Sequence, residues 1–276
     1  MERRHFINLA TQAGVALCFA DQLSALNLKK KPSIGVLLGS VEKYMTENAD
    51  DTLGEISAMG FKELEFPRTY GYPVDKLKAI INNHKLTALG GGDNITHLNN
   101  NFAEYAAEYN EIGKQYVFCY WPWFDGGLNK TIDDWKKQAE VLNKLGERYK
   151  KEGLRLAYHN HNIEFAETEK QIPYDILLQN TNPEFLTFQM DIWWIRKGGQ
   201  WPLDFIEKYP GRFEVCHIKT AGLIKGNEEV QNLDYRKVLE KSKSAGFKHF
   251  VLENEPEIED PFTYFQKSHA LINSYF

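Results

Sequence analysis

The chain of 276 residues has few cysteines, no stripe of basic residues and no long apolar run. Its three cysteines include no CxxC pair, which argues against a disulfide framework and against a cysteine-based zinc site. The net charge of −5 comes without clustered Lys and Arg, which argues against a nucleic-acid partner. The weakly apolar residues 7–20 are too few for a membrane-spanning helix, which needs about 20 apolar residues.

The N-terminal residues resemble a twin-arginine export signal. Arg3 and Arg4 precede residues 7–20, which are uncharged and rich in small side chains. We expect residues 1–31 to be a signal peptide and linker, and the mature chain to be exported to the periplasm without stable membrane insertion. The alternative is that residues 7–20 form an ordinary first helix.

Changing both Arg3 and Arg4 to Lys is expected to trap the precursor inside the cell, because a twin-arginine signal depends on this pair. Cell fractionation and N-terminal sequencing measure the outcome. The exported chain should begin between about residues 21 and 31. Intact Met1 on protein taken from its native cell would contradict this expectation.

Apolar runs that suit strands alternate with amphipathic segments that suit helices throughout residues 32–276. The expected strands are at residues 33–39, 61–66, 86–90, 116–120, 154–157, 186–192, 213–219 and 247–254. The expected helices are at residues 51–59, 73–83, 102–112, 131–153, 174–179, 202–209, 234–245 and 261–275. The glycine-rich residues 91–94 are expected to form a turn. Eight such units in about 245 residues predict a single-domain α/β fold, a (β/α)8 TIM barrel, which typically has roughly 250 residues.

Four consecutive expected strands end on His, Asp or Glu. These side chains are His159 and His161 for the fifth strand, Asp191 for the sixth, His217 for the seventh and Glu253 for the eighth, with Glu164 in the loop beyond the fifth. Side chains alternate along a strand, so His159 and His161 share the inner face, as do His217 and Lys219. The carboxyl ends of parallel strands meet at one mouth of a barrel. Imidazoles and carboxylates together suit one Mn²⁺, Co²⁺, Zn²⁺ or Fe²⁺ ion there, and two or more carboxylates favour Mn²⁺.

The motifs at these strand ends are YHNH at residues 158–161 followed by EF at 164–165, MDIWW at 190–194, HIK at 217–219 and LEN at 252–254. They resemble motifs of the xylose-isomerase-like barrel superfamily of sugar phosphate isomerases and epimerases, which also contains inosose dehydratases and endonuclease IV. Its members usually bind one divalent metal through Glu, Asp, His and Glu on strands five to eight. The resemblance implies that Asp191, His217 and Glu253 are ligands. His159 stands where many members have Glu, so His159 or Glu164 would complete the shell.

Tryptophans follow the fourth and sixth expected strands. Trp121 and Trp123 lie after the fourth strand, and Trp194 lies after the sixth. Their rings offer flat apolar faces to a sugar ring, although packing at the barrel rim would also explain them. Clusters of Arg or Lys and glycine-rich helix N-termini, which would bind phosphate, are not evident in the sequence. We therefore expect the ligand to be a neutral sugar or glycoside.

These residues indicate a metal-dependent enzyme that moves a proton next to a sugar carbonyl, through an enediolate-type intermediate. His159 and His161 are candidates for the base, and His161 is our choice, while Lys219 would polarise the oxygen. The outcome would be isomerisation, epimerisation or elimination, and export favours an epimerase or lyase that acts on a keto-sugar or ketoglycoside. The alternatives are a non-catalytic carbohydrate-binding barrel and a nuclease like endonuclease IV, which would need several metals and a basic face. A homo-oligomer remains open.

Overall fold

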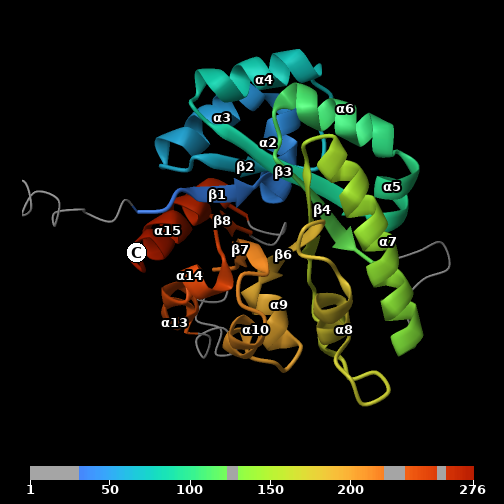
Figure 1. Ribbon diagram of the computed structural model, residues 1–276. Coiled ribbons are helices and arrows are strands. Elements are labelled where there is room, and N and C mark those ends of the chain that lie inside the picture. Colours follow the sequence, from blue (N-terminus) through green and yellow to red (C-terminus); the bar gives the residue numbers. More distant parts are fainter. Residues whose placement is uncertain (1–30, 123–129, 221–233, 254–258) are drawn as a thin grey trace, which may run out of the picture. The chain divides into compact units, whose positions relative to one another are not determined.

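Eight parallel strands close into a barrel, in the order in which they follow one another along the chain (Figure 1). They are β1 (Ile34–Leu37), β2 (Glu63–Glu65), β3 (Thr87–Asn94), β4 (Tyr116–Trp121), β5 (Arg155–His159), β6 (Leu186–Asp191), β7 (Phe213–Ile218) and β8 (His249–Leu252). Strand β1 pairs with both β2 and β8, which closes the sheet. The (β/α)8 barrel predicted from the sequence is therefore confirmed.

The computed structural model describes residues 31–122, 130–220, 234–253 and 259–276. The predicted signal segment up to residue 30 and Trp123 lie outside the described residues. Residues 33–276 form one unit by their internal contacts. In the described part of the chain, none of the helices combines the length and the apolar character that crossing a membrane requires.

Helices connect the strands and pack on the outside of the barrel (Figure 1). In chain order, with η for 3-10 helices, they are η1 (Leu38–Val41), α2 (Glu42–Glu47), α3 (Ala49–Ala58), α4 (Val74–Asn83), α5 (Ile95–Asn100), α6 (Phe102–Ile112), α7 (Ile132–Lys151), η2 (Ile163–Phe165), α8 (Pro173–Asn180), α9 (Ile192–Lys197), α10 (Pro202–Lys208), α13 (Tyr235–Glu240), α14 (Ser242–Ala245) and α15 (Pro261–Asn273). Helix α7 begins directly after Thr131, which is its N-cap in a capping box with Asp134. The single helix expected at residues 234–245 is two short helices, α13 and α14.

Two groups of apolar side chains fill the fold, one inside the barrel and one between the strands and the helices. The inner group consists of Leu89, Tyr116, Phe118, Ala157, Val215 and Val251. The outer group includes Leu156, Tyr158, Cys216, Phe250 and Leu252. Neighbours along each strand thus alternate between the two groups, as a pleated strand requires. The same alternation directs His159, His217 and Glu253 toward the barrel axis at the mouth, as the sequence predicts.

Strand β3 is longer than predicted, because its glycines continue the strand and form no turn. A Cβ atom on Gly92 would lie 1.7 Å from the carbonyl oxygen of Phe118. A Cβ atom on Gly91 would lie 2.0 Å from the carbonyl oxygen of Phe66. Neither separation is sterically allowed, so glycine is needed for the close approach of this strand to its neighbours. The expectation of a turn at residues 91–94 was therefore wrong.

Candidate metal centre

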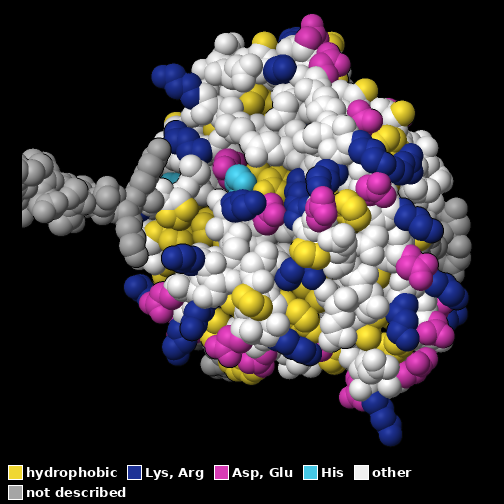
Figure 2. Space-filling model, in the orientation of Figure 1, with side chains coloured by type: hydrophobic (Ala, Val, Ile, Leu, Met, Phe, Trp, Pro, Cys, Tyr) yellow, Lys and Arg dark blue, Asp and Glu magenta, His cyan; other side chains and the backbone are white. Residues whose placement is uncertain are grey.

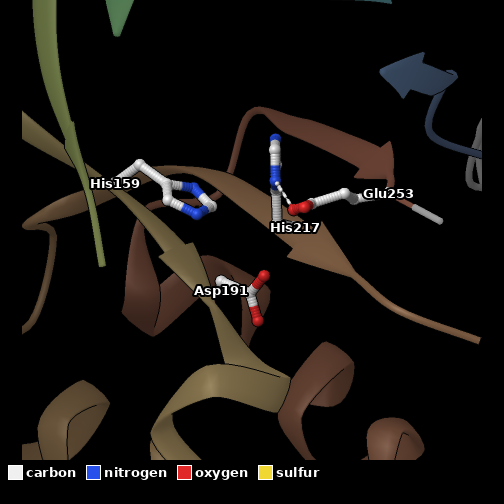
Figure 3. A group of neighbouring side chains, drawn as sticks. All are labelled: His159, Asp191, His217 and Glu253. Carbon is white, nitrogen blue, oxygen red and sulfur yellow. Dashed lines mark hydrogen bonds and ion pairs between the residues drawn. The ribbon is translucent and has the colours of Figure 1, made fainter. Parts of the chain in front are cut away.

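Four side chains with metal-binding atoms converge at the carboxyl ends of β5 to β8 (Figure 3). They are His159, Asp191, His217 and Glu253, and one ligand atom from each lies within 4.8 Å of the other three. His159 and Asp191 are the last residues of β5 and β6, His217 lies in β7, and Glu253 directly follows β8. Asp191 and His217 are register partners on neighbouring strands, which places them side by side. The structure thus brings together one residue from each of the four strand ends.

Asp191 leaves one carboxylate oxygen available to a ligand. Its Oδ1 accepts a hydrogen bond of 2.8 Å from the backbone N–H of Trp194 and so caps α9. Its Oδ2 is buried and has no hydrogen-bond partner among the described residues, and Lys219 Nζ lies 3.8 Å from it. Burial of a carboxylate oxygen without a hydrogen bond is costly. A positively charged ligand at this oxygen would therefore stabilise the site.

Carboxylates outnumber ammonium groups around these four residues. Asp191, Glu253 and the neighbouring Glu65 bring three carboxylates, and Lys219 brings one ammonium group. Lys219 Nζ lies 2.7 Å from Glu253 Oε1, and His217 Nδ1 lies 2.8 Å from Glu253 Oε2. With neutral imidazoles, a divalent cation would balance this excess of buried negative charge. Two imidazoles and two carboxylates are also donors that such cations accept, so the residues present fit a metal ion.

Burial and neighbouring charges shift the pKa values at the centre in opposite directions. Burial raises the pKa of Asp191 to about 7. Burial alone would lower the pKa of His217, but the carboxylates of Glu65 and Glu253 outweigh it and raise this pKa to about 10. Burial and the neighbouring imidazoles hold the pKa of His159 well below its usual value. The carboxylates thus stabilise positive charge at the centre, and a bound cation would take the place of the proton on His217.

Glu164, the other residue considered as fourth ligand, lies outside this group. It belongs to η2 and is fully buried. Its Oε1 accepts a hydrogen bond of 2.7 Å from the Tyr158 hydroxyl, and its Oε2 accepts one of 2.9 Å from the backbone N–H of His161. Because Tyr158 packs in the outer group, these bonds hold the carboxylate away from the barrel axis. The structure places His159, and not Glu164, with the other three residues.

His161 lies between the four-residue group and a pair of tryptophans. Its ring centroid is 4.8 Å from that of His159. It stacks on Trp121 at 3.7 Å with the ring planes 12° apart, and the Trp194 ring lies 5.4 Å away. Its Nδ1 is buried without a hydrogen-bond partner among the described residues. Burial lowers the pKa of His161 to about 4, so this ring is neutral near pH 7.

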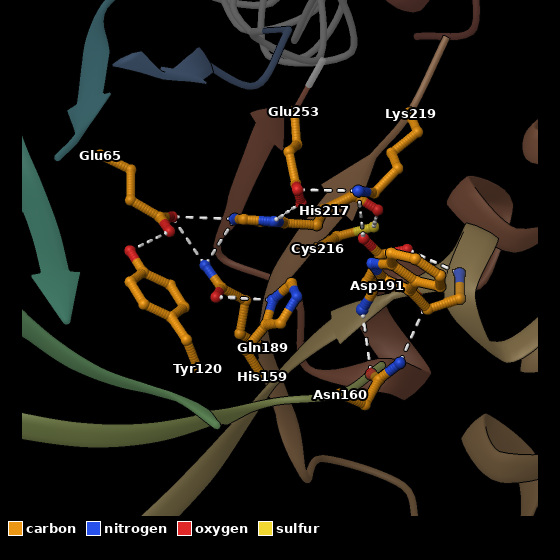
Figure 4. Close-up of polar contacts among 11 residues, drawn as sticks. Glu65, Tyr120, His159, Asn160, Gln189, Asp191, Cys216, His217, Lys219 and Glu253 are labelled. Atoms are coloured by element: carbon orange, nitrogen blue, oxygen red, sulfur yellow. Dashed lines mark hydrogen bonds and ion pairs between the residues drawn. The ribbon is translucent and has the colours of Figure 1, made fainter. Parts of the chain in front are cut away.

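Glu65 and Gln189, which were not predicted from the sequence, complete the contacts of the centre together with Tyr120 (Figure 4). Glu65, the last residue of β2, is fully buried. Tyr120 donates a hydrogen bond of 2.8 Å to Glu65 Oε1, and Gln189 Nε2 donates one of 2.7 Å to Glu65 Oε2. Glu65 Oε2 also lies 2.9 Å from His217 Nε2, and Gln189 Oε1 lies 3.0 Å from His159 Nδ1. Both imidazoles of the centre therefore have a hydrogen-bond partner besides the other members of the group.

Comparison with known proteins shows similarity to carbohydrate-modifying enzymes. No protein-family model matches the chain. The inosose dehydratase of Clostridium perfringens is 28% identical over 174 residues, which cover 55% of this chain and 58% of that protein. The matched part thus spans little more than half the length of this relative.

Solved structures resemble the barrel over nearly its whole length. A sugar phosphate isomerase/epimerase from Parabacteroides distasonis superposes with a TM-score of 0.74 at 20% identity, over 90% of this chain and 96% of that chain. This chain therefore shares the barrel fold of that protein. The 3-keto-D-glucoside 4-epimerase from E. coli superposes on it with a TM-score of 0.64 at 16% identity, over 88% of this chain and 100% of that chain. The resemblance drawn from the strand-end motifs is confirmed for the fold.

Strand alternation is the signal that could have revealed Gln189. Gln189 precedes Asp191 by two positions in β6, so both side chains point to the barrel axis. Glu65 follows Glu63 by two positions in β2, and a carboxylate within an expected strand is rarely buried unless it has a partner. Applying the two-residue period inward from Asp191 would have selected Gln189, whereas Glu65 is out of step with the expected strand end at Phe66.

Proposed function

We propose that this chain is a divalent-metal-dependent enzyme that catalyses isomerisation, epimerisation or elimination on a carbohydrate. The observation that carries the proposal is the convergence of His159, Asp191, His217 and Glu253 beside the unpaired Nδ1 of His161. Similarity to an inosose dehydratase, and a fold in common with a 3-keto-D-glucoside 4-epimerase, support carbohydrate chemistry at this centre.

The four converging residues are the proposed ligands of one cation. Mn²⁺ is the favoured ion because two carboxylates contribute, and Co²⁺, Zn²⁺ or Fe²⁺ are alternatives because two imidazoles also contribute. The cation, when bound, would act as a Lewis acid on a carbonyl or hydroxyl oxygen of the sugar. Asp191 Oδ2 is the first atom that we expect to take part, since it has no hydrogen bond of its own among the described residues.

The protein groups beside the centre are suited to proton transfer and to substrate orientation. His161 Nδ1 would accept the proton from the carbon next to the sugar carbonyl. Stacking on Trp121 fixes the plane of this imidazole, so its nitrogen is held in one direction. Lys219 Nζ, which Glu253 holds at 2.7 Å, would donate a hydrogen bond to a substrate oxygen. His161, Trp121 and Lys219 all belong to the part of the barrel that the structure describes.

A neutral sugar is the substrate class that these surroundings favour. Trp121 is 38% exposed and offers an apolar face at the end of β4. Two arginines that follow strands β2 and β6 already have partners. Arg68 pairs with Glu42 at 3.0 Å, and Arg196 lies 3.8 Å from the centre of the Trp201 ring. Their charge is therefore less available to a phosphate group.

The nuclease alternative is less well supported by the surface charge. Figure 2 shows Lys and Arg side chains interspersed with Asp and Glu on the face it presents, without a stripe of one sign. A protein that binds the nucleic-acid backbone is expected to gather basic groups along one path.

Removal of the metal is expected to abolish turnover, because the sugar oxygen would lose its Lewis acid. The assay is a screen of unphosphorylated keto-sugars and ketoglycosides with the purified protein, repeated after treatment with a chelator and again after addition of Mn²⁺. Circular dichroism of the treated protein controls for unfolding. Undiminished turnover by protein shown to be metal-free would refute the metal dependence. Sugar binding without turnover in any metal would favour the carbohydrate-binding alternative.

A further inference from the structure

Glu65 lies at the centre of a hydrogen-bond network that connects the two imidazoles of the metal centre (Figure 4). Its carboxylate accepts hydrogen bonds at both oxygens, from Tyr120 at Oε1 and from Gln189 at Oε2. His217 Nε2 approaches the same Oε2 to 2.9 Å. Gln189 Nε2 and His217 Nε2 are 2.6 Å apart, and both lie within hydrogen-bonding distance of this one oxygen. Three neighbours thus occupy the carboxylate, which leaves it little capacity to act as a ligand itself.

The contact with Glu65 determines which nitrogen of His217 is available to a cation. An ionised carboxylate only accepts hydrogen bonds and would repel a lone pair, so we assign the proton to Nε2 of His217, although the Gln189 amide nitrogen also lies 2.6 Å from this atom. Nδ1 is the nitrogen on the side of Glu253, 2.8 Å from its Oε2. When His217 is neutral, its lone pair is therefore on Nδ1, the nitrogen nearest to Glu253.

Glu65 acts on the second imidazole, that of His159, through the amide of Gln189. The Gln189 amide nitrogen faces the Glu65 carboxylate, because a carbonyl oxygen there would be repelled. The amide oxygen consequently faces His159 and lies 3.0 Å from its Nδ1. His159 Nδ1 then donates a proton to this oxygen, and its Nε2 carries the lone pair.

We propose that Glu65 is a positioning residue that fixes the tautomers of both His217 and His159, so that Nδ1 of the first and Nε2 of the second bind the cation. The role rests on the proposed metal centre. A carboxylate behind a metal-bound imidazole holds the ring in place and strengthens it as a donor, and its loss typically lowers metal affinity by about 10- to 100-fold. Here one carboxylate serves two imidazoles, one directly and the other through Gln189.

The test compares Mn²⁺ affinity, by calorimetric titration of metal-free protein, in the wild type, Glu65→Gln and Glu63→Gln. Glu63 is a matched control, because it lies in the same strand and contacts His249 Nδ1 at 3.0 Å, away from the four-residue group. We expect Glu65→Gln to bind Mn²⁺ about 10- to 100-fold more weakly, and Glu63→Gln to bind it as the wild type does. Gln189→Met should weaken binding less than Glu65→Gln, since it removes the amide's contacts with His159 and Glu65 but leaves the Glu65 carboxylate beside His217 Nε2.

A second measurement separates a positioning role from a general effect on folding. Nitrogen-15 NMR of the histidine rings in Zn²⁺-loaded wild type should show a protonated Nε2 and a metal-bound Nδ1 for His217, and this pattern should be lost in Glu65→Gln. Unchanged affinity and an unchanged ring pattern in Glu65→Gln would overturn the role of Glu65 and leave the metal centre standing. A wild type that binds no Mn²⁺ would overturn the metal centre, and the role of Glu65 with it.

Discussion

Replacing Asp191 by Asn is expected to empty the metal centre while α9 stays capped. Asp191 has two separate functions, because Oδ1 accepts the hydrogen bond from the Trp194 backbone and Oδ2 has no hydrogen bond among the described residues. Asparagine keeps an oxygen for the cap but removes the negative charge that a divalent cation needs. Asp191→Ala should lose both functions, with an additional loss of about 1 kcal/mol in the free energy of unfolding from the missing cap.

Elemental analysis after equilibrium with Mn²⁺ measures this result as metal bound per chain. Thr131→Ala is the matched control, since Thr131 caps α7 through the Asp134 backbone N–H at 3.2 Å and is not one of the four converging residues. This control should lose stability and keep its metal. Wild-type metal content in both Asp191 variants would show that Asp191 is not a ligand.

Replacing His161 by Asn is expected to leave the metal in place and to remove proton transfer. His161 is not one of the four converging residues, and its Nδ1 has no partner among the described residues that would compete for a substrate proton. Asn cannot act as a base, so exchange of solvent deuterium into the carbon next to the substrate carbonyl should fall by about 10²- to 10⁴-fold.

The measurement is proton NMR of a keto-sugar that the wild type turns over, incubated with each protein in D₂O. His84→Asn is the control, because His84 contacts Asp50 at 2.8 Å on the surface and serves no proposed role at the centre. Metal content should be unchanged in both variants. If the substrate incorporates deuterium as fast with His161→Asn as with the wild type, the base is another residue.

The alternation of expected strands and helices was enough to predict the barrel, and the local pattern was enough to select all four strand ends, that of His159 included. Asp191, His217 and Glu253 each end an apolar run, and parallel topology brings such ends together without further information. Whether His159 or Glu164 joins them was not predictable. Glu164 follows the strand, where the two-residue period no longer applies, and the turn in η2 decides where its carboxylate points.

The features that the sequence did not reveal depend on contacts between distant parts of the chain. Glu65 and His217 are 152 positions apart, and nothing near either residue indicates that they meet. Gly91 and Gly92 were interpreted as a turn because glycine is common in turns. Their actual role comes from the backbone of neighbouring strands, whose carbonyl oxygens leave no room for a Cβ atom.

Anomalous diffraction at the manganese absorption edge, from crystals of the Mn²⁺-loaded protein, tests the central claim most directly. The claim is that one cation binds among His159, Asp191, His217 and Glu253. We predict a single anomalous peak in contact with these four side chains, with Nδ1 as the His217 donor and Nε2 as the His159 donor. A peak bound by other residues, or no peak among these four at saturating Mn²⁺, would contradict the account.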